Sequence, residues 1–155
     1  MFVYHFRLRK GLTVAAAVVL LMVTTLILLL PGCQKQESTP IPAGTDAQRL
    51  EYLTSLGWAV EEQPVETLDL LLPEKLTEDW ADYARLQKEQ NLPFSDFAGQ
   101  SVKRYTYAVT NYPGIAQGVQ ANLFVCGDQL IGGDIISLGE NGFQTGLAFP
   151  EQKNA

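Results

Sequence analysis

Histidine and cysteine are nearly absent from this 155-residue sequence, which holds one histidine and two cysteines. The histidine, His5, precedes a long apolar run, so the chain beyond that run has no imidazole to act as a general base or as a zinc ligand. Nucleophilic pairs of the Ser–His or Cys–His type are excluded there. Cys126 lies in an apolar stretch and is predicted to be a buried structural thiol. We expect no disulfide with Cys33, so stability must come from packing.

Positive charge is scarce outside the N-terminus. Three of the 11 Lys and Arg residues are Arg7, Arg9 and Lys10, which leaves 8 against 17 Asp and Glu, a net charge of −9. Nucleic acids and anionic lipid headgroups attract basic surfaces, so this acidic part is not expected to bind either. The charge is typical of a solubilising surface.

The sequence also lacks the short motifs of common active sites. It has no EF-hand calcium loop, no phosphate-binding glycine loop and no Gly-x-Ser-x-Gly segment. Carboxylate pairs such as Glu61 with Glu62, or Glu78 with Asp82, leave a minimal carboxylate-dependent hydrolase as an alternative. The first pair would point to opposite faces of a strand, and the second fits helix capping. We therefore expect no enzyme, no cofactor and no metal.

The dominant feature that is present is an uncharged run from Gly11 to Pro31. Residues 12–30 are aliphatic or Met apart from three threonines, and as a helix they would be about 28 Å long, close to the thickness of the bilayer core. The run predicts a transmembrane anchor over 11–32. The preceding cations predict that 1–10 are cytoplasmic and that the C-terminal part lies outside the cell membrane.

Two other interpretations of this run remain open. Leu30-Pro31-Gly32-Cys33 resembles a lipobox, which makes Cys33 a candidate lipidation site, although Pro31 fits that pattern poorly. A cleaved secretory signal is the other, although its apolar region is normally about 7–15 residues. All three interpretations place the domain that follows outside the cytoplasm.

The remaining chain predicts a flexible tether over 33–44, one domain over 45–150 and a disordered tail over 151–155. Thr45 and Gln48 form a capping-box pattern at the start of a first helix, which Gly57 ends. A second helix follows Pro73, with Thr77 as its expected N-cap.

Alternating and apolar stretches predict the strands, over 58–63, 65–72, 101–111, 120–126, 129–137 and 143–149. Gly127-Asp128 predicts a tight hairpin, and Gly132-Gly133 predicts a bulge or a close backbone approach. The predicted fold class is α+β: an N-terminal transmembrane helix, then one small domain with an antiparallel sheet of about four to six strands and two helices packed on one face.

Two segments are candidates for an interaction surface. One is a basic and aromatic patch, and the other is an acidic residue behind two glycines. Their residues are Lys103, Arg104, Tyr105, Tyr107 and Tyr112, and Gly132, Gly133 and Asp134.

Three groups of segments carry a resemblance to a known family. They are 49–53 with Leu56-Gly57-Trp58, then 83–90 with 102–107 and Asn111-Tyr112-Pro113, and finally Ala121-Asn122-Leu123 with Ile131-Gly132-Gly133-Asp134. Over roughly residues 46–149 the chain resembles an uncharacterised family of small, N-terminally anchored proteins of Gram-positive Firmicutes, defined by a domain of unknown function. The resemblance implies an extracytoplasmic setting and no particular chemistry.

Together these features predict a membrane-tethered, non-catalytic binding or interaction module of the cell envelope. Its expected partners are the membrane, through residues 12–30, and an envelope protein or a cell-wall component. The hydrolase, and a lipid-anchored version of the same module, are the alternatives.

Overall fold

The computed structural model describes residues 39–139 and 142–150, which form six strands, two α-helices and one 3₁₀ helix. In chain order the elements are β1 (Ile41–Pro42), α2 (Asp46–Ser55), β2 (Glu66–Leu71), α3 (Asp79–Glu89), η1 (Phe94–Phe97), β3 (Ser101–Ala108), β4 (Val119–Cys126), β5 (Gln129–Ser137) and β6 (Gln144–Thr145). β1 falls inside the segment that was expected to be a tether.

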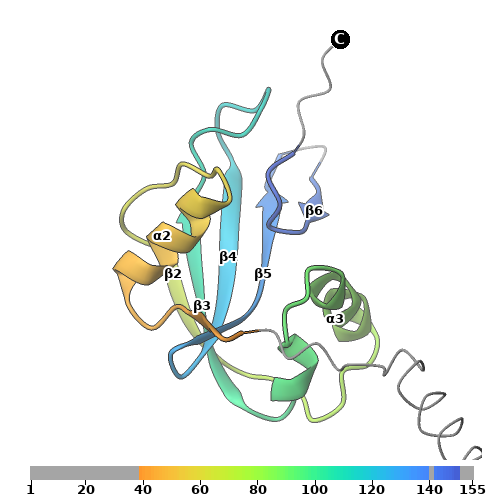
Figure 1. Ribbon diagram of the computed structural model, residues 1–155. Coiled ribbons are helices and arrows are strands. Elements are labelled where there is room, and N and C mark those ends of the chain that lie inside the picture. Colours follow the sequence, from red (N-terminus) through yellow and green to blue (C-terminus); the bar gives the residue numbers. More distant parts are fainter. Residues whose placement is uncertain (1–38, 140–141, 151–155) are drawn as a thin grey trace, which may run out of the picture. The chain divides into compact units, whose positions relative to one another are not determined.

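All six strands belong to one antiparallel sheet (Figure 1). The order is β1-β5-β4-β3-β2, and β6 also pairs with β5. The predicted Gly127-Asp128 hairpin is confirmed, since it joins β4 to β5 with Cys126 opposite Gln129. Gly127 has a φ of +58°, a conformation that residues with a side chain seldom adopt.

The pairing of β4 with β5 shifts by one residue, which confirms the predicted bulge. Val125 pairs with Leu130 but Phe124 pairs with Gly132, so Ile131 is the extra residue. The close backbone approach is present as well. A Cβ added to Gly132 would lie 2.8 Å from the Phe94 side chain, and one added to Gly133 would lie 2.8 Å from the backbone oxygen of Asn122.

α2 begins with the predicted capping box, in which Thr45 and Gln48 exchange hydrogen bonds between side chain and backbone. The helix ends at Ser55, Leu56 is its C-cap, and Gly57 follows with a φ of +94°. Its buried side packs on one face of the sheet, in a core whose main members are Leu53, Trp58, Tyr107, Val119, Ala121, Leu123, Val125, Leu130 and Ile135.

α3 packs on the other face of the sheet, where Trp80, Tyr83 and Ala84 contact a second core. That core consists of Leu72, Phe94, Val102, Phe124 and Ile131. The expected Thr77 cap is wrong, because the N-cap residue is Glu78 and no side chain caps the helix.

The predicted arrangement of the helices on one face is therefore wrong: α2 and α3 cover opposite faces of the sheet (Figure 1). The physical reason lies in the central strands. Val119–Cys126 and Gln129–Ser137 are buried along nearly their whole length, on both faces. A sheet that is apolar on both sides needs a covering layer on each.

Two strand predictions also need correction. Residues 58–63 form no strand, only an isolated bridge between Val60 and Val109. The strand predicted over 143–149 is reduced to Gln144–Thr145.

The predicted transmembrane helix over 11–32, like the tail over 151–155, lies outside the described residues. No helix within 39–139 and 142–150 has the length and apolar character needed to cross a membrane. The fold class is accordingly corrected to a small domain with a six-stranded antiparallel sheet and two α-helices on opposite faces.

Candidate functional site

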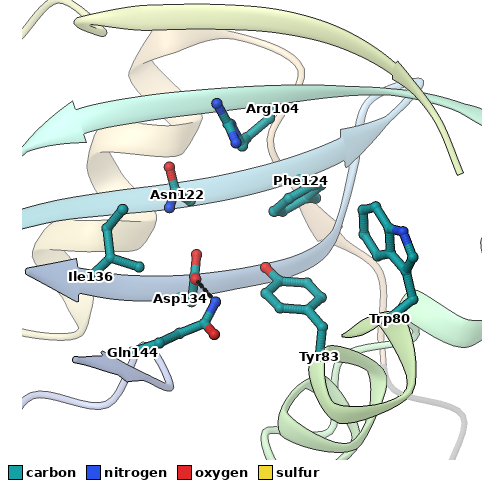
Figure 2. Close-up of a pocket in the computed structure, with 8 residues that line it drawn as sticks. All are labelled: Trp80, Tyr83, Arg104, Asn122, Phe124, Asp134, Ile136 and Gln144. Carbon is teal, nitrogen blue, oxygen red and sulfur yellow. Dashed lines mark hydrogen bonds between the residues drawn. The ribbon is translucent and has the colours of Figure 1, made fainter. Parts of the chain in front are cut away.

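A pocket of about 340 Å³ lies between α3 and the sheet. Five elements line it (Figure 2). α3 contributes Trp80 and Tyr83, β3 contributes Arg104, β4 contributes Asn122 and Phe124, β5 contributes Asp134 and Ile136, and β6 contributes Gln144. This volume is near the lower end of the range for small-molecule sites, about 300–1,000 Å³.

Strand register brings the polar groups of the pocket together. Asn122 on β4 stands directly opposite Asp134 on β5 and also opposite Thr106 on β3. The Thr106 hydroxyl donates a hydrogen bond of 2.7 Å to the amide oxygen of Asn122. Side chains two residues apart share a face of a strand, so Arg104 projects beside Thr106 on the same side of the sheet.

Asp134 is the most deeply buried charged group of the pocket, with 2% of its surface exposed. Its Oδ2 accepts a hydrogen bond from the Nε2 of Gln144, whereas its Oδ1 has no partner among the described residues. Burial raises the pKa of Asp134, and the neighbouring Gln144, Asn122, Arg104 and Tyr83 side chains partly oppose that rise. A buried acceptor without a partner costs free energy, so this oxygen favours a ligand that donates to it.

The Tyr83 hydroxyl points toward the Asp134 carboxylate (Figure 2), but no hydrogen bond of normal geometry joins them, and this hydroxyl too lacks a partner. Burial, and then the charge of Asp134, raise the pKa of Tyr83 well above its usual value. The hydroxyl therefore stays protonated and is available both to donate and to accept.

Aromatic rings form the wall around these groups. The rings of Tyr83 and Phe124 lie 5.3 Å apart between centroids, and that of Trp80 lies 6.2 Å from Tyr83. Phe94 packs against two of these rings. Its ring centroid lies 5.9 Å from that of Trp80, in a stacked arrangement, and 5.0 Å from that of Tyr83, edge-on. Packing of this kind fixes the positions of the rings before a ligand arrives.

Arg104 connects the pocket to the edge strand. Its Nη2 pairs with the carboxylate of Glu66 on β2, while its Nε–H is buried and has no partner in the described structure. The pocket thus presents one free acceptor, one hydroxyl and one free donor. Its eight lining residues include a single carboxylate, Asp134, so they do not supply the pair that a two-carboxylate hydrolase requires.

The predicted basic and aromatic patch is divided between the two faces of the sheet. Arg104 lies on the pocket face, whereas Tyr105 and Tyr107 pack beneath α2 around Arg49. Lys103 is exposed and forms an ion pair with Asp69, with a distance of 2.8 Å. Tyr112 stacks on Trp58 at 5.9 Å and packs against the same core as Tyr105 and Tyr107.

The second predicted segment contributes one residue to the pocket, Asp134. Gly132 and Gly133 are buried, and the side chains of Phe94 and Leu147 lie against them. Six further residues line the pocket that were not predicted as site residues: Trp80, Tyr83, Asn122, Phe124, Ile136 and Gln144. The alternation of residues within each strand could have indicated the face on which Arg104 and Asn122 lie. The strand register that brings them near Asp134 could not be predicted from the sequence.

Other candidates lie elsewhere. Cys126 is a free, half-buried thiol, and the possible lipidation site Cys33 lies outside the described residues. Glu61, Glu62, Glu78 and Asp82 are exposed. Within 39–139 and 142–150, no group of three or more His, Cys, Asp or Glu side chains is arranged to hold a metal ion.

Comparison with known proteins gives one match. No curated protein and no solved structure matched the chain. Residues 52–135 match the family described as "Domain of unknown function (DUF4830)". This region contains α3 and six of the eight residues that line the pocket, Asp134 among them; the part of the site outside it is Ile136 and Gln144. Because the match covers more than half of the sequence, the chain belongs to the DUF4830 family.

Proposed function

We propose that this protein is a non-catalytic binding domain of the cell envelope and that its ligand enters the pocket between α3 and the sheet. The observation that carries the proposal is that three buried polar atoms of residues lining the pocket have no partner among the described residues: Oδ1 of Asp134, the hydroxyl of Tyr83 and Nε of Arg104. They come from three different elements, and each would gain a hydrogen bond from a ligand. Rigid aromatic walls around a few polar groups are typical of small-molecule sites.

The eight lining residues include neither a second carboxylate nor a histidine, which favours binding over catalysis. Asp134 is the lone carboxylate of the pocket, and the sequence supplies no histidine after His5. The exposed carboxylates considered for a hydrolase do not line the pocket. We therefore propose recognition without turnover, with a cell-wall component or an envelope protein as the source of the ligand.

The location outside the cytoplasm rests on the sequence. An apolar run over residues 12–30 follows Arg7, Arg9 and Lys10. Under the positive-inside rule, a segment of this composition holds a protein at the cell membrane with its N-terminus in the cytoplasm and its C-terminal domain outside. Lipidation at Cys33 is the competing mode of attachment and leaves the domain on the same side.

Protease protection tests the location. Cells producing the full chain with a C-terminal tag are treated with protease before and after lysis. We expect loss of the tagged domain in intact cells, while a cytoplasmic marker protein survives until lysis. Survival of the domain until lysis would refute the location. Cys33→Ser combined with a labelled-palmitate assay then separates the two modes of attachment, since only a lipidated chain loses its label in the variant.

Thermal shift measurements test the binding function. The purified full chain is heated with members of four probe classes in turn: neutral sugars, free amino acids, aliphatic amines and inorganic phosphate. We expect at least one class to raise the melting temperature of the parent and to have a smaller effect on Asp134→Asn. If every class leaves the parent unchanged, or if Asp134→Asn responds as the parent does, binding in this pocket is refuted.

A further inference from the structure

The pocket contains a mixture of hydrogen-bonding groups that restricts the ligand. Oδ1 of Asp134 can only accept when ionised, Nε of Arg104 can only donate, and the Tyr83 hydroxyl can do both. An ammonium group only donates, and a phosphate or a carboxylate group only accepts. A hydroxyl group does both, so neighbouring hydroxyls on one molecule can pair with all three protein groups.

Charge also favours a neutral ligand. Arg104 and Asp134 both line the pocket with opposite charges, so a cation is repelled by the first and an anion by the second. Burying an unbalanced charge there would add a desolvation penalty. Glu66 already balances the charge of Arg104, so an anion gains little there, and an ammonium group would leave Nε–H of Arg104 without an acceptor.

The ion pair between Arg104 and Glu66 argues against a free amino acid. A carboxylate bound side-on to arginine uses two parallel N–H donors. Nη2 of Arg104 is already engaged by Glu66 on the edge strand, which leaves Nε–H as the donor without a partner. A carboxylate could therefore form only one of these two bonds, and it would lie in the same pocket as the buried carboxylate of Asp134.

The aromatic walls of the pocket match the apolar part of a ligand that carries several hydroxyl groups. Trp80, Tyr83 and Phe124 line the pocket beside the polar groups. The C–H face of a sugar ring is apolar and packs on aromatic rings, while its hydroxyl edge is polar. We propose, on the basis of the binding function above, that the pocket binds one ring of a neutral saccharide, with ring hydroxyls paired to Asp134, Tyr83 and Arg104.

Ligand-observed NMR tests the proposal with the full chain in a polyoxyethylene detergent, whose headgroup carries no sugar. Glucose and N-acetylglucosamine are the neutral probes, cyclohexylamine is the cationic probe and leucine is the zwitterionic probe. Saturation transfer reports contact with the probe, and quenching of tryptophan fluorescence reports on Trp80. We expect at least one sugar to bind and to outcompete both other probes.

Three variants connect binding to the proposed contacts. Asp134→Asn removes the carboxylate, and Tyr83→Phe removes one hydroxyl while it keeps the ring. Each is expected to weaken sugar binding about tenfold or more. Asp82→Asn, an exposed carboxylate on α3, is the matched control and should leave the affinity unchanged.

Several outcomes would overturn the proposal. They are binding of cyclohexylamine or leucine in preference to both sugars, sugar binding that survives in both pocket variants, and no binding of either sugar. Specific binding of a non-sugar probe refutes the saccharide and leaves the binding function in place. Silence of every probe class refutes both.

Discussion

Arg49 and Tyr107 are joined by a buried hydrogen bond of 2.8 Å across 58 positions of sequence, from the Nε of the arginine to the hydroxyl of the tyrosine. The same guanidinium donates through Nη1 to the backbone oxygens of Ala43 and Gly44 and lies 3.6 Å from the centroid of the Tyr105 ring. Arg49 is only 3% exposed, so one side chain ties the segment before α2, the helix itself and β3 together.

Arg49→Ala should therefore lower the free energy of unfolding by about 3 kcal/mol, because it leaves the Tyr107 hydroxyl and two carbonyl groups without their donor. Arg49→Lys should recover less than half of the loss, since an ammonium cannot reproduce the planar fork of donors. Urea unfolding followed by tryptophan fluorescence measures both. Arg85→Ala is the control, because its ion pair with Asp82 is exposed and contributes less than about 1 kcal/mol. Equal losses at the two arginines would contradict the structural role of Arg49.

Asp134→Asn should change how stability depends on pH. Burial raises the pKa of this carboxyl in the folded protein, so the unfolded chain ionises first as the pH rises. The contribution of Asp134 to stability is complete below its unfolded pKa of about 4 and is lost as the pH rises through the folded pKa. Asparagine does not ionise. The stability of the variant relative to the parent should thus increase between about pH 4 and neutrality.

Unfolding curves collected across this pH range provide the measurement. Asp82→Asn controls for the loss of one negative charge at an exposed site of α3. A difference between Asp134→Asn and the parent that stays constant with pH would show that the burial of this carboxyl has no energetic consequence.

Gly133→Ala should destabilise the protein by about 2 kcal/mol through overpacking. Its Cβ would lie 2.6 Å from Cδ1 of Leu147 and 2.8 Å from the backbone oxygen of Asn122, and the backbone of a central strand cannot move away. Gly139→Ala is the matched control, since its Cβ would meet nothing closer than the Ser137 hydroxyl at 3.8 Å. Thermal unfolding of the two variants distinguishes them, and similar melting temperatures would count against the close packing at Gly133.

Gln90 joins the end of α3 to the sheet. Its Nε2 donates to the backbone oxygen of Gly133 at 3.1 Å, and its Oε1 accepts from the backbone N–H of Leu147 at 2.5 Å. Gln90→Met keeps the length of the side chain but leaves both backbone groups unpaired, which should cost about 2 kcal/mol.

Hydrogen exchange gives the sharper readout for this variant. The amide of Leu147 should lose protection in Gln90→Met and keep it in Glu89→Met, which alters an exposed neighbour. Unchanged protection at Leu147 would mean that other contacts hold this segment in place.

Local features of the fold were predictable from the sequence because each depends on a few adjacent residues. The capping box at Thr45 and the hairpin at Gly127-Asp128 belong to this class. The side of the sheet on which α3 packs was not predictable, because the apolar pattern of one helix does not indicate which face of the sheet the helix covers. The nearly continuous burial of 119–126 indicates in retrospect that the sheet is covered on both faces.

The pocket was predictable only in part. Arg104 and Asp134 were recognised individually, but their grouping depends on register across three strands. Trp80 and Tyr83 lie on the side of α3 that packs on the second core, and nothing in the spacing of the helix separates a core tyrosine from one whose hydroxyl has no partner among the described residues. That distinction arises only when the helix is placed against a particular strand.

The bulge at Ile131 in β5 determines which face of the sheet carries Asp134. Leu130 faces α2, Ile131 and Gly132 both face α3, and alternation then directs Asp134 toward α3 as well. If the same residues of β5 alternated regularly from Leu130 onward, without the bulge, Asp134 would face the apolar core under α2 and Ile135 would face the polar cavity. The irregular pairing at Ile131, as much as the identity of any side chain, therefore determines that the domain has a polar cavity at all.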